Sequence, residues 1–437
     1  MQLVAYGAQD IYLTGNPQIT FFKVVYRRHT NFSMEAIQQT FNGTPSITGG
    51  TLTSTISRNG DLVSRLWLDV LMNPQTAIVG GALDNAAWIN NTGCALVKEC
   101  EIEIGGQRID RQYGHWMDLW NELSDHNTDE WLGLNKHAGK GAYQELEGLA
   151  NISRDLQLYI PLQFWFCRNP GLALPLIALQ YHEVKIKLTT RGLAALTVGS
   201  VDIPVGGALV APTVKLWADY IYLDTDERRR FAQVSHEYLI EQVQREEHAG
   251  AAQRSLKLNF NHPVKEIIWV NQDDIALQEV GFDAGVGFYD VRRNIGAGAP
   301  GAFVRAAMLV GNDYFNYTGA LQSTGERISG IFSPESFGKM KLQLNGHDRF
   351  ASRNASYFRT CQPVQAGHRQ PSKHIYVYSF AIKPEEHQPS GTCNFSRIDN
   401  AKMEFEDRLP SGTTTVYAIN YNVLRIMSGM GGLAYSN

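Results

Sequence analysis

The sequence predicts an all-β fold made of two consecutive eight-stranded antiparallel jelly rolls, with long loop insertions and a few short helices. The first observation behind this prediction is that landmarks recur in the same order in both halves of the chain. Residues 159–164 resemble 376–381, and 184–188 resemble 401–405, and both pairs lie 217 positions apart. Two looser echoes join 58–68 with 260–270 and 101–110 with 341–350. Ordered echoes separated by gaps of variable length indicate two β domains of one design.

Length and composition are the second observation. A chain of 437 residues is long enough for two β domains of about 200 residues each. A charged fraction of 19%, an aromatic fraction of 11% and 40 glycines are typical of an ordered, turn-rich β protein. We place an N-terminal segment at 1–24, the first jelly roll at 25–225 and the second at 226–437. A net charge of −4 gives no reason to expect a protein that coats nucleic acid.

In the first half, apolar and polar residues alternate with the period of two that marks a strand. Ile102 and Ile104 alternate with Glu101 and Glu103, and Gly105-Gly106 then supplies a tight turn. The same reasoning predicts the other strands of this half, at 18–26, 53–58, 62–71, 156–166, 183–189 and 213–223.

Helical spacing is local. The segment 113–123 carries Trp116, Leu119, Trp120 and Leu123 at helical intervals, which predicts a helix inside an elaborated loop. We expect one or two further helical turns at 143–149 and a short one at 172–179.

The second half repeats the pattern after a polar connector at 224–231, which we take as the boundary between the domains. Leu342 and Leu344 precede Asn345-Gly346, another strand followed by a turn. Long segments with little alternation, at 73–92 and 271–337, are expected to be functional surface loops. The remaining strands of this half are predicted at 255–260, 266–270, 375–382, 400–405 and 413–424.

Cysteine content and the N-terminus bear on the compartment. Five cysteines form no CxxC pair and cannot all pair with one another, so we expect free buried thiols in a reducing compartment, although Cys94 and Cys100 could bridge. The first residues lack the basic start and apolar core of a signal peptide. The longest apolar stretch, 172–179, is far shorter than a membrane span of about 20 residues. We therefore expect a soluble protein made in the cytosol.

No motif for catalysis, metal or cofactor emerges. His182-Glu183 and His236-Glu237 do not continue as HExxH, so strand polar residues are the favoured interpretation. The segment from Asp224 begins like a calcium loop but lacks the later glycine and glutamate. The basic clusters 27–29 and 228–230 favour surface ion pairs or acidic neighbouring subunits over phosphate. The glycines at 429–432 cannot form a phosphate loop, because too few residues follow for a helix, and they indicate a tight turn.

Several longer segments resemble the major capsid proteins of nucleocytoplasmic large DNA viruses, and those of viruses infecting algae most of all. They are LVAYGAQDIYLTGNPQITFFKVVYRR at 3–28, ISRNGDL at 56–62, IGGQRID at 104–110, PGLALPLIALQYHEV at 170–184, QPSGTCNFSRIDN at 388–400 and YNVLRIMSGMGGLAY at 421–435. The resemblance spans nearly the whole chain and lapses at 73–92, 121–151, 190–212 and 271–337. The order and length of these segments make the resemblance specific.

The resemblance implies a double jelly roll whose homotrimer is a pseudo-hexagonal capsomer. Such capsomers tile an icosahedral virion shell over an internal membrane, with the base facing neighbouring capsomers and minor capsid proteins and with no direct contact to nucleic acid. Two similar domains per subunit fit this assembly, since three subunits then supply six similar sectors. Interfaces within such a trimer are expected to bury more than ~2,000 Å². The resemblance implies neither catalytic activity nor a cofactor.

The predicted outward loops carry the candidate surface residues. Among the N-x-S/T triplets, Asn90 and Asn316 are the glycosylation candidates because they lie in these loops. The aromatic residues Tyr314, Phe315 and Tyr317 are the candidate contacts between loops of a trimer. Two alternatives stay open. One is a minor or vertex-associated capsid paralogue of the same fold, and the other is a carbohydrate-binding jelly-roll protein whose loop aromatics hold sugar.

Overall fold

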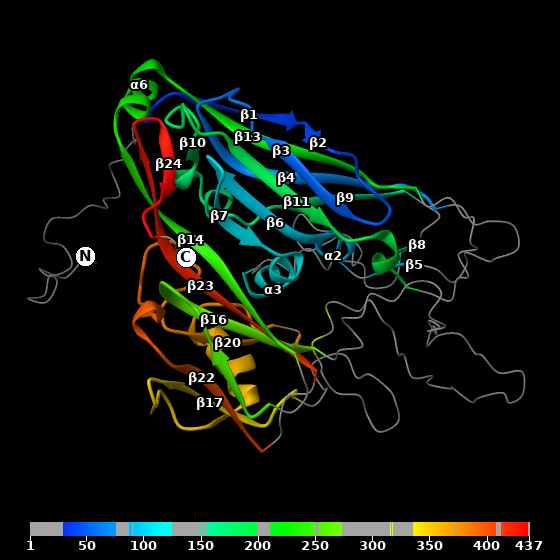
Figure 1. The fold of residues 1–437 in the computed structure, drawn as a ribbon, viewed down its shortest axis with the longest axis vertical. Helices are drawn as coiled ribbons and strands as arrows, with labels where there is room; N and C mark the ends of the chain where they lie inside the picture. Colours follow the sequence, from blue (N-terminus) through cyan, green and yellow to red (C-terminus); the bar gives the residue numbers. More distant parts are fainter. Residues whose placement is uncertain are drawn as a thin grey trace, which may run out of the picture.

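A computed structural model of the chain describes residues 29–75, 87–89, 91–124, 150–151, 155–198, 210–249, 253–272, 315, 317, 335–371, 373–407 and 412–435. Its architecture is two β sandwiches stacked along the long axis of the molecule (Figure 1). The first sandwich, blue to green, lies above the second, green to red. Helix α3 (Gly114–Ser124) lies between the two sandwiches.

The first sandwich is formed by two antiparallel sheets. Sheet 1 has the order β1-β13-β4, with β9 and β10 both pairing with β4. Its strands are β1 (Phe32–Gln39), β4 (Leu62–Met72), β9 (Leu156–Pro161), β10 (Leu174–Pro175) and β13 (Thr213–Leu223). Sheet 2 has the order β2-β3-β11-β6-β7, formed by β2 (Phe41–Asn42), β3 (Gly50–Thr55), β6 (Val97–Ile104), β7 (Gln107–Gln112) and β11 (Val184–Thr190). A small sheet joins β5 (Ala87–Trp88), β8 (Ala150–Asn151) and β12 (Thr197–Val198).

The second sandwich repeats this arrangement. Sheet 3 has the order β14-β23-β16-β20, with β21 on β16 and β24 on β23. Its strands are β14 (His236–His248), β16 (Pro263–Gln272), β20 (Tyr376–Ser379), β21 (Cys393–Asn394), β23 (Thr413–Met427) and β24 (Met430–Leu433). Sheet 4 has the order β15-β22-β17-β18, with β19 on β17, formed by β15 (Ser255–Leu258), β17 (Lys339–Leu344), β18 (His347–Asp348), β19 (Arg353–Asn354) and β22 (Ala401–Glu406).

The two sandwiches have the same topology. The order β1-β13-β4-β9 in sheet 1 corresponds to β14-β23-β16-β20 in sheet 3, and β3-β11-β6-β7 in sheet 2 corresponds to β15-β22-β17-β18 in sheet 4. Each pairing in these two series is antiparallel. Eight principal strands in two facing sheets form a jelly roll, so the prediction of a double jelly roll is confirmed.

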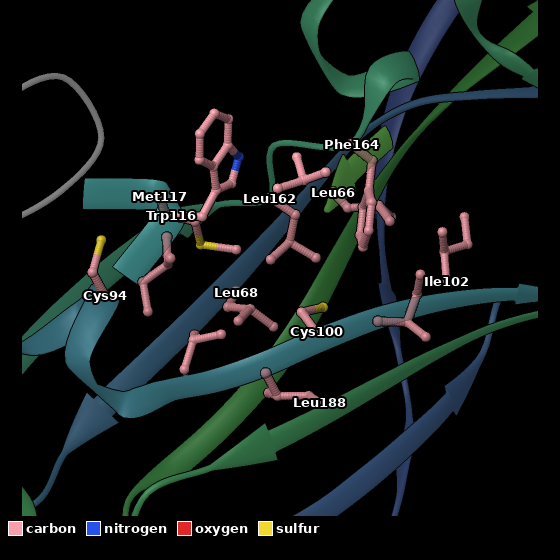
Figure 2. Packing of buried hydrophobic residues seen from close by; sticks show 14 of the residues in the cluster. Leu66, Leu68, Cys94, Cys100, Ile102, Trp116, Met117, Leu162, Phe164 and Leu188 are labelled. Atoms are coloured by element: carbon pink, nitrogen blue, oxygen red, sulfur yellow. The ribbon is translucent and has the colours of Figure 1, made fainter. Parts of the chain in front are cut away.

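Inward-facing side chains of sheets 1 and 2 form the first core (Figure 2). Leu66 and Leu68 on β4 face Cys100 and Ile102 on β6 and Leu188 on β11, and each is at most 1% exposed. The residues between them on the same strands are charged or more exposed, which is the alternation that predicted these strands. The second core lies between sheets 3 and 4 and contains Trp269, Met340, Leu342, Met403 and Phe405.

The sequence alignment of one repeated segment differs from the structural equivalence by one residue. Matching 58–68 with 260–270 aligns Trp67 with Trp269. Trp67 alternates with the buried Leu66 and Leu68 and therefore lies on the outer face of sheet 1, whereas Trp269 is 1% exposed inside the second core. A shift of one residue turns every side chain of a strand to the opposite face. The repeat therefore identifies the equivalent strands correctly, but it assigns their side chains to the wrong faces.

The described helices differ from prediction in several places. Helix α3 confirms the helix predicted at 113–123. The predicted strand 156–166 ends at Pro161, and Trp165–Arg168 form helix α5. The helical turn predicted at 172–179 lies earlier, as η2 (Pro170–Leu172), and β10 follows it. The other described helices are α2 (Thr92–Leu96), η3 (Leu193–Leu196), η5 (Tyr357–Cys361), α8 (Gln362–Gln365) and η6 (Phe395–Arg397).

The polar connector predicted at 224–231 is a helix, α6 (Thr225–Gln233). The Asp224 side chain accepts a hydrogen bond from the backbone N–H of Glu227 at 3.0 Å, so a residue considered for calcium is a helix N-cap. Strands β1 and β14 were not predicted. The strand predicted at 18–26 and the turns predicted at 143–149 lie outside the described residues.

None of the five cysteines, all of which lie in the described residues, forms a disulfide, so Cys94 and Cys100 do not bridge. Both are buried as predicted, whereas Cys361 is exposed. Across the part of the chain that the structure describes, no helix has the length and apolar character needed to cross a bilayer.

Candidate functional site

The ring nitrogens of both histidines in the His-Glu pairs contact backbone atoms of the same chain. His182 Nδ1 lies 2.9 Å from the carbonyl oxygen and 3.1 Å from the amide nitrogen of Gly431, and His236 Nε2 lies 2.8 Å from the carbonyl oxygen of Phe231. Within the described ranges, no cluster of three or more His, Cys, Asp or Glu side chains is arranged to hold a metal ion. Of the basic cluster 228–230, Arg228 pairs with Asp61 at 3.0 Å.

The glycine-rich C-terminal segment forms the hairpin between β23 and β24. Ser428 and Gly429 both have positive φ, at 52° and 80°, which is the geometry of a two-residue hairpin turn. The hairpin packs on the first jelly roll: the N–H of Tyr181 donates to the carbonyl of Gly429 at 2.9 Å, and the N–H of Leu433 donates to Gln107 Oε1 at 3.2 Å. Figure 1 shows β24 beside β7.

The candidate loop aromatics that are described lie inside the subunit. Tyr317 is 1% exposed and donates a hydrogen bond to Asp118 Oδ2 at 2.5 Å, and its ring centroid lies 5.4 Å from that of His115 on α3. Phe315 is 9% exposed, with Lys373 Nζ 5.5 Å from its ring. Both side chains make their described contacts within one chain. Their predicted role as contacts between the subunits of a trimer stays a prediction. Tyr314, Asn316 and Asn90 lie outside the described residues.

The candidate functional site is therefore the seam between the two jelly rolls. The outer face of sheet 3 carries Ile268, Val270, Tyr417 and Ile419, and each is 0% exposed. These side chains belong to the same apolar cluster as the core of the first jelly roll. The Trp116 ring on α3 lies 5.4 Å from the Tyr417 ring, and the Tyr417 hydroxyl lies 2.8 Å from His115 Nδ1. The halves are therefore joined by packed apolar side chains.

Buried polar groups cross the seam beside this apolar contact. The N–H of Val243 on β14 donates to Asp110 Oδ1 on β7 at 3.1 Å, and the side-chain amide of Gln242 donates to the carbonyl of Ile109. Burial raises the pKa of Asp110 to about 6, although the hydrogen bonds from the Val243 N–H and the Gln112 side chain favour its charged form. A second tie runs from helix α3, whose Leu123 carbonyl accepts from the N–H of Arg369 at 2.9 Å.

Glu241 on β14 is the centre of a buried ion cluster. Its carboxylate lies 2.9 Å from Arg168 Nη1 of the first jelly roll and 2.8 Å from Lys265 Nζ of the second, and His387 Nδ1 lies 3.4 Å away. Burial would raise the pKa of Glu241, but the His387 hydrogen bond and the Lys265 and Arg168 charges lower it to about 2. Burial also lowers the pKa of Lys265, against the opposing effect of Glu241 and Glu266. We assign an ionised carboxylate, because three cationic or donor groups converge on it.

His368 forms a second buried cluster close to the seam. Its side chain is fully buried, with Nε2 2.7 Å from Glu266 Oε2 and Nδ1 2.7 Å from Glu385 Oε1. Burial alone would lower its pKa, but the two carboxylates raise it to about 9, so both ring nitrogens donate as an imidazolium. The His368 ring meets Trp120 of α3 edge-on, with centroids 6.1 Å apart. A charged histidine thus lies where the second jelly roll touches α3.

These contacts hold the two domains in one orientation. Sequence reasoning missed the seam because its members come from distant segments. One signal was available: 267–270 on β16 and 416–419 on β23 are nearly continuous apolar runs, and a strand with both faces apolar is covered on both faces.

Comparison with known proteins places the chain among viral capsid proteins. Residues 20–224 match the family model described as major capsid protein N-terminus, and residues 227–432 match the model of the large eukaryotic DNA virus major capsid protein. The chain is 47% identical over 462 aligned positions to the major capsid protein of Pyramimonas orientalis virus, covering 100% of this chain and 99% of the relative. It is 41% identical, with the same coverage, to the major capsid protein of Paramecium bursaria Chlorella virus 1.

Solved structures agree with this assignment. A quasi-atomic model of the PBCV-1 virus capsid matches with a TM-score of 0.73 at 36% identity, covering 96% of this chain and 100% of that chain. The Faustovirus major capsid protein matches with a TM-score of 0.66 at 13% identity, a level that supports the fold alone.

Proposed function

Because the chain belongs to the major capsid protein family of large eukaryotic DNA viruses, and its role is that of a structural capsid protein, we propose that three copies assemble into a pseudo-hexagonal capsomer that tiles an icosahedral shell. The observation that carries this proposal is the pair of topologically equivalent jelly rolls joined by a buried seam. Two similar sectors in a fixed orientation let a threefold particle fill a sixfold position in a lattice.

We propose domain limits of 25–225 and 226–437, with residues 1–24 contacting neighbouring subunits. Support for the limits comes from strand pairing, since the chain leaves sheet 1 at Leu223, passes through α6 and enters sheet 3 at His236. The further partners we propose are minor capsid proteins at the base, and the shell overlies an internal membrane without direct contact between this chain and nucleic acid. We place its synthesis in the host cytoplasm and propose glycans on its outward loops.

We also propose that the chain is not an enzyme and uses no cofactor. Support comes from two buried ion pairs, Glu241 with Lys265 and Glu266 with His368, in which each charged side chain is neutralised by its partner. The carbohydrate-binding alternative is not favoured, because Tyr317, one of the loop aromatics on which it relies, is buried against His115. A minor capsid paralogue would differ in copy number, which quantitative mass spectrometry of purified particles would count.

Light scattering after size exclusion, with negative-stain images of the peak, tests the capsomer. We expect a mass of three times 48.8 kDa and hexagonal outlines. A chain that stays monomeric at micromolar concentration and shows no hexagonal particles would contradict the proposal.

A further inference from the structure

Helix α3 places a histidine, His115, in the seam near its N-terminal end. His115 is 7% exposed, and its Nδ1 lies 2.8 Å from the Tyr417 hydroxyl of β23. Its ring centroid lies 5.4 Å from that of Tyr317 and 5.7 Å from that of Tyr417, and a third phenol ring, Tyr113, lies 6.3 Å from Tyr417. Nε2 is buried and has no hydrogen-bond partner among the described residues. A neutral imidazole leaves one polar atom unpaired there, but an imidazolium would bury an unpaired N–H donor together with a positive charge.

The charges that act on His115 from neighbouring segments are those of cations. Burial is the first cause that lowers the pKa of His115 well below its ordinary value of 6.5. The cations that add to this effect are Arg245 on β14, Arg191 and Lys373. Glu247, also on β14, is paired with Arg245. The surroundings of His115 therefore favour its neutral form.

The carboxylate that follows His115 on its own helix is engaged with other partners. Asp118 lies one turn further along α3, and its oxygens are 3.0 and 3.1 Å from Lys373 Nζ. It also accepts a hydrogen bond from the Tyr317 hydroxyl at 2.5 Å. A protonated His115 consequently gains no carboxylate partner among the described residues, whereas His368 has two.

Three other buried titratable groups of the seam hold it together in acid. His368 stays charged between its two carboxylate partners, since its pKa is about 9. The pKa of Asp110 is raised from 3.8 to about 6, so the folded state binds this proton more tightly and is stabilised as the pH falls through 6. The pKa of Glu241 is about 2, so its carboxylate stays ionised. His115 differs from these three groups because acid disfavours its buried position.

We propose that His115 is an acid switch, whose protonation below about pH 6 loosens the first turn of α3 from Tyr317 and Tyr417. The contacts of Asp110 and His368 hold the rest of the seam. An imidazole that leaves its buried site regains the ordinary pKa of 6.5, so protons favour the open form, and the opening constant should rise about tenfold for each pH unit below 6.5. Every contact lies within one chain, so the switch does not depend on the proposed capsomer. A shell built from such subunits would be tighter at neutral pH than in an acidic compartment.

Hydrogen exchange measured by mass spectrometry at pH 7, 6 and 5 tests the switch. Wild type and His115→Gln are compared at each pH, so that the pH dependence of the exchange chemistry itself cancels. Glutamine keeps a polar side chain but takes up no proton in this range. We expect the exchange rate of α3 peptides in wild type, divided by that in His115→Gln, to rise at least about tenfold from pH 7 to pH 5. The same ratio for β14 peptides that contain Val243 should stay constant, because Val243 belongs to the Asp110 contact.

Two further variants separate titration from packing. Tyr417→Phe removes the hydroxyl that contacts His115 but leaves the imidazole able to titrate, so α3 should still lose protection in acid. His374→Gln removes another buried histidine whose pKa burial lowers, and it should also keep the wild-type response. If His115→Gln does not fold, the rate of α3 peptides relative to β14 peptides within wild type replaces the comparison and should rise by the same factor.

All samples are measured at one protein concentration, because assembly shifts apparent stability. A ratio that does not change between pH 7 and pH 5 would overturn the switch. So would an acid response that persists in His115→Gln, or one that disappears in His374→Gln.

Discussion

At the scale of single residues, the seam contains a buried ion cluster in which removing any one charge destabilises the protein. Glu241 receives Arg168 from the first jelly roll and Lys265 from the second, and Lys265 is fully buried. Buried ion pairs add little net stability compared with apolar contacts, but removing one partner leaves an uncompensated charge and costs about 3–5 kcal/mol. The cluster therefore opposes any packing of the two domains that would separate Arg168 from Glu241.

His368 predicts how stability depends on pH. Its folded pKa of about 9 lies above the ordinary value of 6.5, so its contribution of roughly 3 kcal/mol is complete below pH 6.5 and is lost as pH rises towards 9. Thermal midpoints measured from pH 6 to pH 10 should fall over that window. In His368→Gln the midpoint should be lower at pH 6 and this decline should vanish. His29→Gln, at an exposed histidine, is the control, and equal pH profiles for His368→Gln and wild type would contradict the assignment.

At the scale of elements, α3 packs closely against the first core because its first residue, Gly114, has no side chain. A Cβ on Gly114, the first residue of α3, would overlap the backbone carbonyl oxygens of Cys94 and Val97. The backbone atoms of α2 and β6 cannot move to relieve this overlap, whereas the end of a flexible side chain could. The glycine therefore lets α3 approach α2 closely enough for Trp116 and Met117 to enter the core (Figure 2).

Gly114→Ala should consequently destabilise the protein by several kcal/mol, in the range of severe overpacking. Gly50→Ala is the matched control, because a Cβ at Gly50 meets nothing within 4 Å, and replacing a glycine at such a position changes stability by less than about 1 kcal/mol. Urea denaturation of the two variants compares them directly. If Gly114→Ala unfolds at the same urea concentration as Gly50→Ala, then α3 has room to move and the close approach is not required.

Strands could be predicted from the sequence where one face of the strand is buried and the other is exposed to solvent. In the segment 213–223, buried residues alternate with more exposed ones as far as Tyr220, and β13 has those same bounds. Strand β1 was missed because most of its residues are exposed on both faces, and β14 because its polar residues serve the seam. The helix α6 was missed because its apolar content is low and its start depends on the Asp224 cap. The seam needs long-range contacts, and its one local signal was the pair of nearly continuous apolar runs at 267–270 and 416–419.

At the scale of the whole molecule, one apolar cluster serves two domains. Tyr417, Ile419, Ile268 and Val270 of the second jelly roll belong to the core cluster of the first, whereas Phe405 and Met403 belong to a separate cluster between sheets 3 and 4. The first jelly roll cannot lose the second without exposing Trp116 and its neighbours to water. We therefore expect the domains to unfold together, unlike domains joined by a small, polar interface.

Calorimetry tests this coupling. Wild type should show one transition whose calorimetric and van 't Hoff enthalpies agree. Tyr417→Ala removes a ring that contacts Tyr113, His115 and Trp116, so it should cost about 3–5 kcal/mol and split the transition in two. Phe405→Ala deletes a ring of similar size inside the second core, away from the seam, and should lower the single transition without splitting it. All three proteins are compared at one concentration, because assembly shifts apparent stability. Two transitions in the wild-type chain would show that the seam does not couple the domains. The fixed orientation that the proposed capsomer needs would then have to come from neighbouring subunits.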